Sequence, residues 1–464
     1  MFIIIKIGLL PLYIELYDEK VPELRPRLEK FYETAAQKLE TCGFEVFRVP
    51  FCRLEPEFRS AVNFFESKNA QCVVTLHMAY SPSLESSEVL AGTKLPIVIL
   101  DATDTFDFGP AQNSDAVLYC HGIHGVMDMC SLLIQNGKKF AIAAGHLEYS
   151  DVMARVGGFV KAAAAALSLN GSRVGSIGGA FAGMGDFAVG DKEIYDRFGV
   201  ETVRPNPETL KNLSASVSSS SIEAEIISDN NNFKRSGEFS RDIHVNTVRD
   251  GLAVREWIEE ECLSAFTVNF MQIGEKTGIS YMPFMEVCKA MGRGIGYAGE
   301  GDVLTASFTG AFLKCFKETS FVEIFCPDWR SNTLFLSHMG EMNINLTAKM
   351  PEIAEKPFIY GSGVNPVACD GCYKSGNGVF VNIFKGKTDF KLLVSEIAME
   401  EENESESNFK GIIRGWMKPK KNISEFLEML SKAGATHHSI LIYDASIEQI
   451  RFFGEILNLD VIEI

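Results

Sequence analysis

Two glutamates and three histidines in the C-terminal half of the chain stand where side chains could bind a metal ion. Glu300 lies between two glycines, which let the backbone turn sharply and bring its carboxylate to a ligand. Glu323 lies in an apolar run, where burial of a carboxylate is costly unless it is paired or metal-bound. His338 ends the next predicted strand, and His437 and His438 follow a predicted helix. These carboxylates and imidazoles form a mixed oxygen and nitrogen donor set, suited to Mn²⁺ or a similar divalent cation.

The adjacent histidines His437 and His438 cannot both be assigned to the ion from their positions in the sequence. Neighbouring side chains of an extended segment point to opposite sides, so we expect only one of the two to face the ion. Spacing alone does not say which one. Of the two carboxylates, we expect Glu323 to have the higher pKa, because its surroundings are more apolar than those of Glu300.

Four C-terminal motifs that carry these residues resemble the successive signatures of L-arabinose isomerases, within the wider L-fucose/L-arabinose isomerase group. They are Ile295–Asp302, Phe321–Glu323, Ser337–Met339 and Gly434–His438. Earlier stretches agree more loosely, so that the resemblance runs over most of the chain: Leu76–Pro82, His121–Gly125, Ala144–His146, Gly183–Val189 and Ala265–Phe270.

The resemblance implies a metal-dependent aldose–ketose isomerase acting on a pentose or (deoxy)hexose such as L-arabinose, L-fucose or D-galactose. It implies a Mn²⁺ site, with two of its ligands also serving as the catalytic acid/base pair, and a sugar pocket between the subunits of a trimer or hexamer. The implied metal ligands are Glu300, Glu323, His338 and, of the pair, His438, with Glu300 and Glu323 as the acid/base groups. The implied sugar contacts are Tyr80, His124, Met184, Phe270 and His437.

Aldose–ketose interconversion is chemically consistent with this donor set. The reaction moves a proton between neighbouring carbons and needs charge stabilised on both oxygens, which a divalent cation supplies. One carboxylate can take the C2 proton while another acid/base group serves the oxygens, giving a cis-enediol. Two carboxylates at one cation can hold different pKa values, as this division of roles requires.

Three departures from the family pattern fall mainly on sugar-facing positions. The apolar run 9–12 replaces a polar residue of the first strand-to-helix loop, and His121 stands where arabinose isomerases usually carry glutamine. Residues 324–328 replace an acidic, tyrosine-rich run. The sequence therefore favours the chemistry and leaves the identity of the sugar open.

Two glycine-rich motifs leave a nicotinamide-dependent oxidoreductase as the alternative function. Residues 183–188 match G-x-G-x-x-A, with Glu201 near where a ribose-binding acid belongs, and residues 294–299 match again. However, a Gly-Asp pair interrupts the helix that the first motif requires, and no convincing strand precedes the second match. A non-catalytic sugar-binding protein is a third class, which would leave Glu323 and the histidine pair without a purpose.

The pattern of apolar runs along the chain predicts three domains. In residues 1–165, short apolar runs alternate with amphipathic stretches, which is typical of a doubly wound parallel α/β domain. Residues 166–318 continue this pattern, whereas residues 319–464 hold short alternating segments separated by turns, typical of an antiparallel barrel. We therefore predict two Rossmann-like α/β domains followed by an antiparallel β-barrel-like C-terminal domain, with ligands at the carboxyl ends of the parallel strands.

Composition excludes several classes of protein. The 464 residues are 46% hydrophobic and 23% charged, which is typical of globular domains and not of disordered or fibrous chains. A net charge of −17 disfavours nucleic acid and anionic membrane as partners. Eleven scattered cysteines predict a reducing compartment, and the apolar run 2–10 is too short to span a bilayer and predicts the first strand. We expect a cytoplasmic protein.

Overall fold

The computed structural model describes residues 4–403 and 407–464 and divides into two compact units. The smaller unit extends to Leu167, and the larger runs from Ser168 to Ile464. The strand predicted at residues 2–10 begins outside the described residues, and its described part belongs to β1 (Lys6–Leu12).

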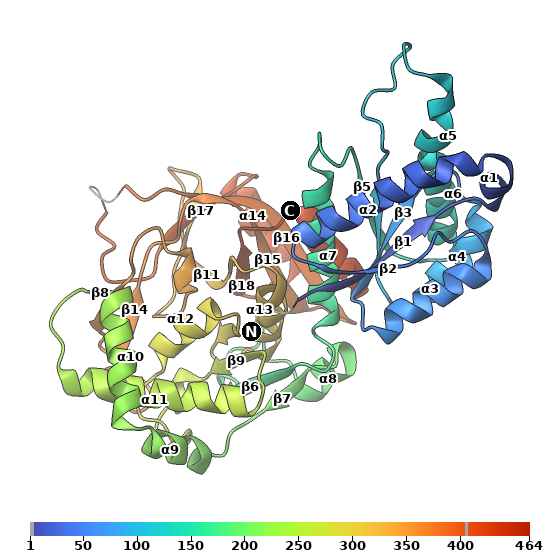
Figure 1. The fold of residues 1–464 in the computed structure, drawn as a ribbon. Coiled ribbons are helices and arrows are strands. Elements are labelled where there is room, and N and C mark those ends of the chain that lie inside the picture. The colour runs from blue at the N-terminus through green and yellow to red at the C-terminus, as the bar shows by residue number, and fades with distance from the viewer. Residues whose placement is uncertain (1–3, 404–406) are drawn as a thin grey trace. The chain divides into compact units, whose positions relative to one another are not determined.

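The smaller unit is a parallel sheet with helices on both faces (Figure 1). Its remaining strands are β2 (Glu45–Arg48), β3 (Cys72–His77), β4 (Ile97–Asp101) and β5 (Phe140–Ala144), and its helices are α1 (Glu15–Lys20), α2 (Arg25–Thr41), α3 (Glu55–Ser67), α4 (Ser83–Gly92), α5 (Val117–Cys120), α6 (Gly122–Gln135) and α7 (Val152–Leu167). The strand order is β2-β1-β3-β4-β5, and α2 and α7 pack on one face while α3, α4 and α6 form the other. Because helices cover both faces, β3 is buried along its whole length.

One helical run in the described chain, Ser114–Gln135, is long and apolar enough to cross a membrane by length and composition alone. In the structure it is divided into the 3-10 turn Ser114–Ala116, α5 and α6. Val126, Met129 and Leu133 of α6 join the core beneath the sheet. We therefore interpret the run as part of the α/β unit.

The larger unit contains a second parallel sheet, as the sequence predicts. Its strands, in the order β10-β9-β6-β7, are β10 (Gly296–Gly299), β9 (Ala265–Val268), β6 (Arg173–Ile177) and β7 (Glu201–Val203). The helices of this part are α8 (Asp191–Phe198), α9 (Pro207–Ser216), α10 (Ser219–Asn232), α11 (Arg241–Glu260), α12 (Phe284–Gly292) and α13 (Val303–Cys315).

The antiparallel part of the larger unit is a closed barrel. Its strands are β11 (Thr319–Asp328), β12 (Thr333–Leu336), β15 (Gly376–Lys385), β16 (Phe390–Glu400), β17 (Gly415–Pro419) and β18 (His438–Ile442), and pairing of β15 with β16 closes the ring. Strand β19 (Asp460–Glu463) adds to β16 in parallel. Helices α14 (Ile423–Ala433) and α15 (Ile447–Ile456) flank β18 in the chain, and a small sheet joins β8 (Lys234–Arg235), β13 (Glu352–Glu355) and β14 (Val367–Asp370).

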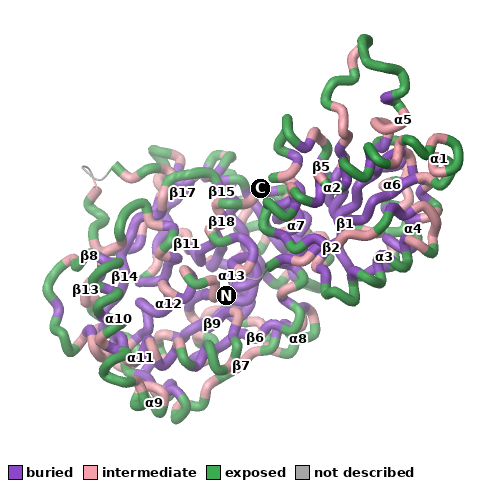
Figure 2. Tube along the Cα trace, viewed as in Figure 1, coloured by how far each residue is buried: buried purple, intermediate pink, exposed green. Residues whose placement is uncertain are grey.

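Helix α13 lies between the second parallel sheet and the barrel and packs against both. Nearly all of its residues are buried, and Figure 2 shows it as one of the most continuously buried segments of the larger unit. A helix that is apolar on all sides needs such a position. The predicted fold class, two parallel α/β sheets followed by an antiparallel barrel, is confirmed. The three domain boundaries stay a prediction, since compactness groups the second sheet and the barrel together.

Candidate metal and active site

Glu300 occupies a strained turn directly after β10. Its φ of +63° lies in the left-handed region, which residues other than glycine rarely adopt. The turn is fixed on both sides, because the amide of Glu300 donates to the carbonyl of Val268 and its carbonyl accepts from the amide of Phe181. Strain of this kind persists only where the surroundings enforce it, and it clusters at functional sites.

Glu323 reaches the same region from the barrel. In the register of β11 with β18, Glu323 pairs with His438, and a β-bulge follows at Ile324/Cys326. Its Oε2 lies 3.4 Å from Nε2 of His338, and its Oε1 lies 3.9 Å from Nε2 of His437. Strand pairing therefore brings this carboxylate to the three predicted histidines.

Both histidines of the adjacent pair face Glu300, and the expectation that only one of them faces the ion stays a prediction. Nε2 of His437 and Nε2 of His438 each lie 3.6 Å from Oε2 of Glu300. Strand β18 begins only at His438, and His437 belongs to the turn after α14. The alternation of side chains within a strand therefore does not apply to this pair.

Each of the three histidines has a second carboxylate at its other ring nitrogen. Nδ1 of His338 lies 2.7 Å from Glu341, Nδ1 of His437 lies 2.6 Å from Asp186, and Nδ1 of His438 lies 3.0 Å from Asp302. Glu341 also accepts a hydrogen bond of 2.7 Å from Tyr297, and Asp302 caps α13 through the amide of Thr305. Asp186 and Asp302 are hydrogen-bonded to their histidines, whereas Glu341 and His338 are close without hydrogen-bond geometry. A carboxylate hydrogen-bonded to Nδ1 orients an imidazole whose other nitrogen faces a metal or a substrate.

The two glutamates have pKa values shifted in opposite directions. Burial would raise the pKa of Glu300, but the facing His437 and His438 outweigh it and lower that pKa to about 2. Burial raises the pKa of Glu323, and the surrounding histidines only partly offset this. The expectation that Glu323 has the higher pKa of the pair is confirmed. For His438, burial opposes the charged form, but Asp302 and Glu300 raise its pKa to about 10.

The donor atoms fit a divalent cation. Ligand atoms of Glu300, His437 and His438 lie within 4.8 Å of one another, with His338 and Glu323 beside them. Within the described residues, Oε2 of Glu300 and Nε2 of His438 are buried and have no hydrogen-bond partner. Unpaired buried polar atoms are costly, and a cation would satisfy both of these at once. The mixed carboxylate and imidazole set is the kind that Mn²⁺ and similar ions accept.

The predicted sugar contacts are distributed over both units. Phe270 stacks on Phe181, whose amide donates to the carbonyl of Glu300, so Phe270 lies close to the turn that carries Glu300. Met184 lies half-buried in the loop 178–190 that also carries Asp186. Tyr80 and His124 belong to the smaller unit, and their part in the site stays a prediction.

Sequence reasoning missed two residues of this site, Asp186 and Glu341. Glu341 follows His338 by three positions, a spacing that could have indicated the contact. Asp186 lies both in the stretch Gly183–Val189 that resembles the family and in the glycine-rich motif 183–188, but neither assigns it a role. Nothing in the sequence connects it to His437, which is far away along the chain.

The glycine-rich segments do not have the geometry of a dinucleotide fold. The loop 178–190 separates β6 from α8, and α8 begins only at Asp191. The second match, 294–299, largely forms strand β10 itself. A dinucleotide motif needs a tight strand-to-helix turn, in which the helix begins within the glycine run.

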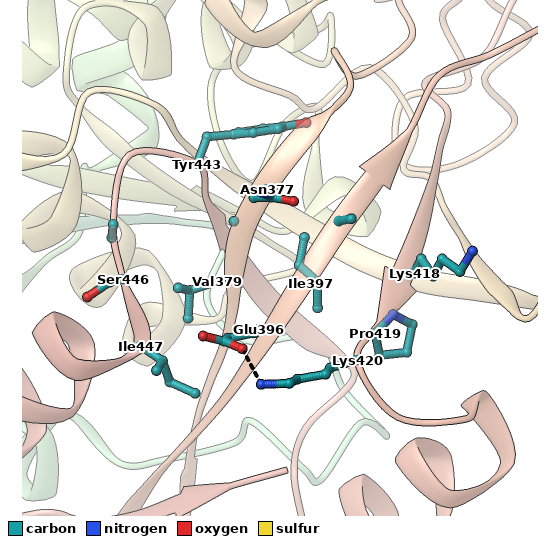
Figure 3. A pocket seen from close by; sticks show the side chains of 13 residues that line it. Asn377, Val379, Glu396, Ile397, Lys418, Pro419, Lys420, Tyr443, Ser446 and Ile447 are labelled. Atoms are coloured by element: carbon teal, nitrogen blue, oxygen red, sulfur yellow. Dashed lines mark hydrogen bonds and ion pairs between the residues drawn. The ribbon is translucent and has the colours of Figure 1, made fainter.

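A separate hollow of about 590 Å³ is lined by Val379, Tyr443 and the exposed ion pair of Glu396 with Lys420, whose charged atoms lie 2.9 Å apart (Figure 3). Val379 pairs with Ile442 at one end of β18, whereas the histidine group lies at the His438 end. The hollow contains none of the site residues, so we place the chemistry at the buried carboxylate–histidine group instead.

Two domain models of one protein family match these regions of the chain. The L-arabinose isomerase C-terminal domain matches residues 318–460, and the L-arabinose isomerase central domain matches residues 184–317. Together these matches cover well over half of the chain and contain Glu300, Glu323 and all three site histidines.

Several curated L-arabinose isomerases are similar to the chain. That of Oceanobacillus iheyensis is 27% identical over 237 residues, covering 49% of each protein. That of Shouchella clausii is 25% identical, covering 70% of this chain and 66% of the relative. That of Mycolicibacterium smegmatis is 24% identical, covering 86% and 81%. The chain thus spans about half the length of the first relative and most of the last. With both domain matches in sequence order and the carboxylate–histidine group inside them, the chain belongs to the L-arabinose isomerase family.

Proposed function

We propose that the protein is a metal-dependent aldose–ketose isomerase acting on a pentose or (deoxy)hexose such as L-arabinose, L-fucose or D-galactose. One observation carries the proposal: two glutamates and three histidines converge, and Oε2 of Glu300 and Nε2 of His438 are buried there without a hydrogen-bond partner among the described residues. Family membership supports the same reaction class.

Glu300, Glu323, His338 and His438 would hold the divalent cation, for which we propose Mn²⁺. When bound, the cation supplies Lewis-acid stabilisation of charge on two adjacent sugar oxygens. Asp302, hydrogen-bonded to Nδ1 of His438, keeps the opposite ring nitrogen directed toward the site.

In the proposed reaction, Glu300 and Glu323 transfer the protons. The carboxylate that is ionised accepts the proton from C2 of the sugar, which gives a cis-enediol, and the other carboxyl group exchanges a proton with the sugar oxygens. The lowered pKa of Glu300 and the raised pKa of Glu323 distinguish the two carboxylates, as a division between two roles requires.

Tyr80, His124, Met184, Phe270 and His437 form the proposed sugar pocket. The family resemblance implies that Tyr80 and His124 meet the metal group of a neighbouring subunit, so we propose a trimer-based oligomer, with a hexamer as the expected state and pockets shared between subunits. Analytical ultracentrifugation tests this, and full activity of an isolated monomer would contradict it. Buried thiols such as Cys72 and Cys288 agree with a reducing, cytoplasmic compartment.

A screen of aldoses in the presence of Mn²⁺, scored for ketose formation, tests the proposal directly. We expect at least one pentose or hexose to be converted, and Glu300→Gln to abolish the conversion. Oxidation of a sugar with reduction of a nicotinamide cofactor would instead support the alternative oxidoreductase. Sugar binding with no conversion in any condition would support a non-catalytic binding protein.

A further inference from the structure

Two consecutive residues of the loop 178–190 hold the two consecutive histidines of the site. Oδ2 of Asp186 accepts the backbone N–H of His437 at 3.1 Å and lies 2.6 Å from Nδ1 of the same residue. The ring of Phe187 stacks on His438 with centroids 4.6 Å apart and an interplanar angle of 16°. The loop therefore fixes His437 through hydrogen bonds and His438 through ring contact.

The two contacts at Asp186 determine the direction of the His437 ring. With its backbone amide and Nδ1 both directed at one carboxylate oxygen, the ring presents Nε2 to the opposite side. There Nε2 lies 3.6 Å from Glu300 and 3.9 Å from Glu323. The side chain of a histidine outside a strand is otherwise free to choose among rotamers, so Asp186 supplies the missing constraint.

His437 and His438 differ in their exposure to solvent. The side chain of His438 is fully buried, and its Nε2 has no hydrogen-bond partner among the described residues. The side chains of His437 and Asp186 are 33% and 37% exposed. His438 therefore lies on the floor of the site, where an ion would bind, and His437 lies at the mouth, where a substrate enters.

We propose that Asp186 is a positioning residue, which holds Nε2 of His437 above the two glutamates to contact a hydroxyl group of the sugar and not the metal ion. This inference rests on the proposed isomerase function. It also gives the glycine-rich motif a role. Gly183 has a φ of +102°, which favours glycine, and no neighbouring atom lies where its Cβ would be. Packing therefore does not require this glycine, whereas the turn that leads to Asp186 does.

The test compares Asp186→Ala with Asp186→Asn in the full-length protein. Because one oxygen of Asp186 receives both contacts, asparagine keeps the acceptor and alanine removes it. Asp191→Ala is the matched control, since Asp191 is a nearby exposed aspartate that pairs with Arg204 on the outside of the site. Each variant is measured for the Kd of Mn²⁺ without sugar, by calorimetry, and for KM and kcat at saturating Mn²⁺.

We expect Asp186→Ala to raise KM about tenfold or more, with the Kd of Mn²⁺ unchanged and Asp186→Asn close to the parent. The control should match the parent in both quantities. An unchanged KM in Asp186→Ala would overturn the positioning role. A weakened Mn²⁺ affinity in that variant would overturn the assignment of His437 to the sugar.

A second readout separates this inference from the proposed function. The protein has eight histidines, so ¹⁵N-histidine labelling gives a ring spectrum that a His437→Asn variant can assign. We expect a hydrogen-bonded Nδ1–H resonance of His437 that is lost in Asp186→Ala and retained in Asp186→Asn. If this holds while no sugar is isomerised, the proposed function fails and the positioning contact stands. If the resonance does not depend on Asp186, the inference fails whatever the activity.

Discussion

Oε2 of Glu300 and Nε2 of His438 lie 3.6 Å apart, and neither atom has a hydrogen-bond partner in the described part of the chain. Glu300 directly follows strand β10 of the parallel sheet, and His438 begins strand β18 of the barrel. Helix α13 joins these sheets, because its N-cap Asp302 also lies 3.0 Å from Nδ1 of His438. The site is therefore a junction between the two sheets and requires both to be folded.

Mn²⁺ should stabilise the folded protein. An ion that binds only the folded state at a hundredfold excess over its Kd adds about 2.7 kcal/mol, which raises Tm by several degrees. We expect chelator to reverse the rise and His438→Ala to abolish it, as measured by differential scanning calorimetry. His146→Ala, an exchange on the smaller unit, should retain the full rise. A Tm that does not change in excess Mn²⁺ would contradict the metal site.

Each catalytic glutamate should be needed for turnover. We expect Glu300→Gln and Glu323→Gln each to lower kcat on the order of 10²-fold or more, because amides cannot transfer the proton. Steady-state kinetics at saturating Mn²⁺ measures this. A glutamine variant with near-normal kcat and bound metal would show that its carboxylate is structural, and Asp302 or Asp328 would then be the next candidates.

The hydrogen should be transferred as a proton by way of a carboxyl group. A proton held by Glu300 or Glu323 can exchange with solvent before it reaches C1, whereas a hydride shift keeps the hydrogen on the substrate. We expect deuterium at C1 of the ketose when the reaction runs in heavy water, as detected by NMR. Complete absence of deuterium would favour the hydride shift.

Gly301→Ala should displace the backbone turn that carries Glu300. Gly301 has φ of +90°, and a Cβ there would lie 2.2 Å from the carbonyl oxygen of Gly179. The turn that carries Glu300 must therefore move, and we expect stability to fall by about 1–3 kcal/mol together with weaker Mn²⁺ binding. Gly43→Ala is the control, since Gly43 has the same φ with no atom within 4 Å of a Cβ. Equal effects of both exchanges on Mn²⁺ binding would argue against a steric cause.

Glu225 should make stability depend on pH. Burial would raise its pKa, but Arg255 and Lys289 outweigh this and lower the pKa to about 2, below the 4.5 of an unfolded chain. The ionised group therefore stabilises the folded state above about pH 4.5, and this contribution is lost as the pH falls toward 2. We expect Glu225→Gln to cost about 3 kcal/mol at pH 7, with a smaller difference from the parent at pH 3.

Urea unfolding at pH 7, 4.5 and 3 measures the contribution of Glu225. Glu223→Gln, on the same helix, removes an exposed partner of Arg241 and should cost less than about 1 kcal/mol. A Glu225→Gln deficit that stayed constant from pH 7 to pH 3 would contradict the assigned pKa shift.

The order of the elements and the types of donor at the site are local properties of the sequence. Apolar runs of strand length and 3.6-residue periodicity predict the alternation of strands and helices in residues 1–165 and the change to an antiparallel barrel after residue 318. The costly burial of Glu323 and the glycines around Glu300 likewise marked functional carboxylates without any tertiary information.

The way in which the histidines are held depends on contacts between distant parts of the chain. Whether His437 faces the site depends on where β18 begins and on Asp186, a residue brought there from a distant loop. The carboxylates behind His338 and His438 depend in the same way on the packing of α13 and of the turn after β12. Side-chain direction in a turn follows from contacts between distant segments, and those contacts form only when the sheets pack together.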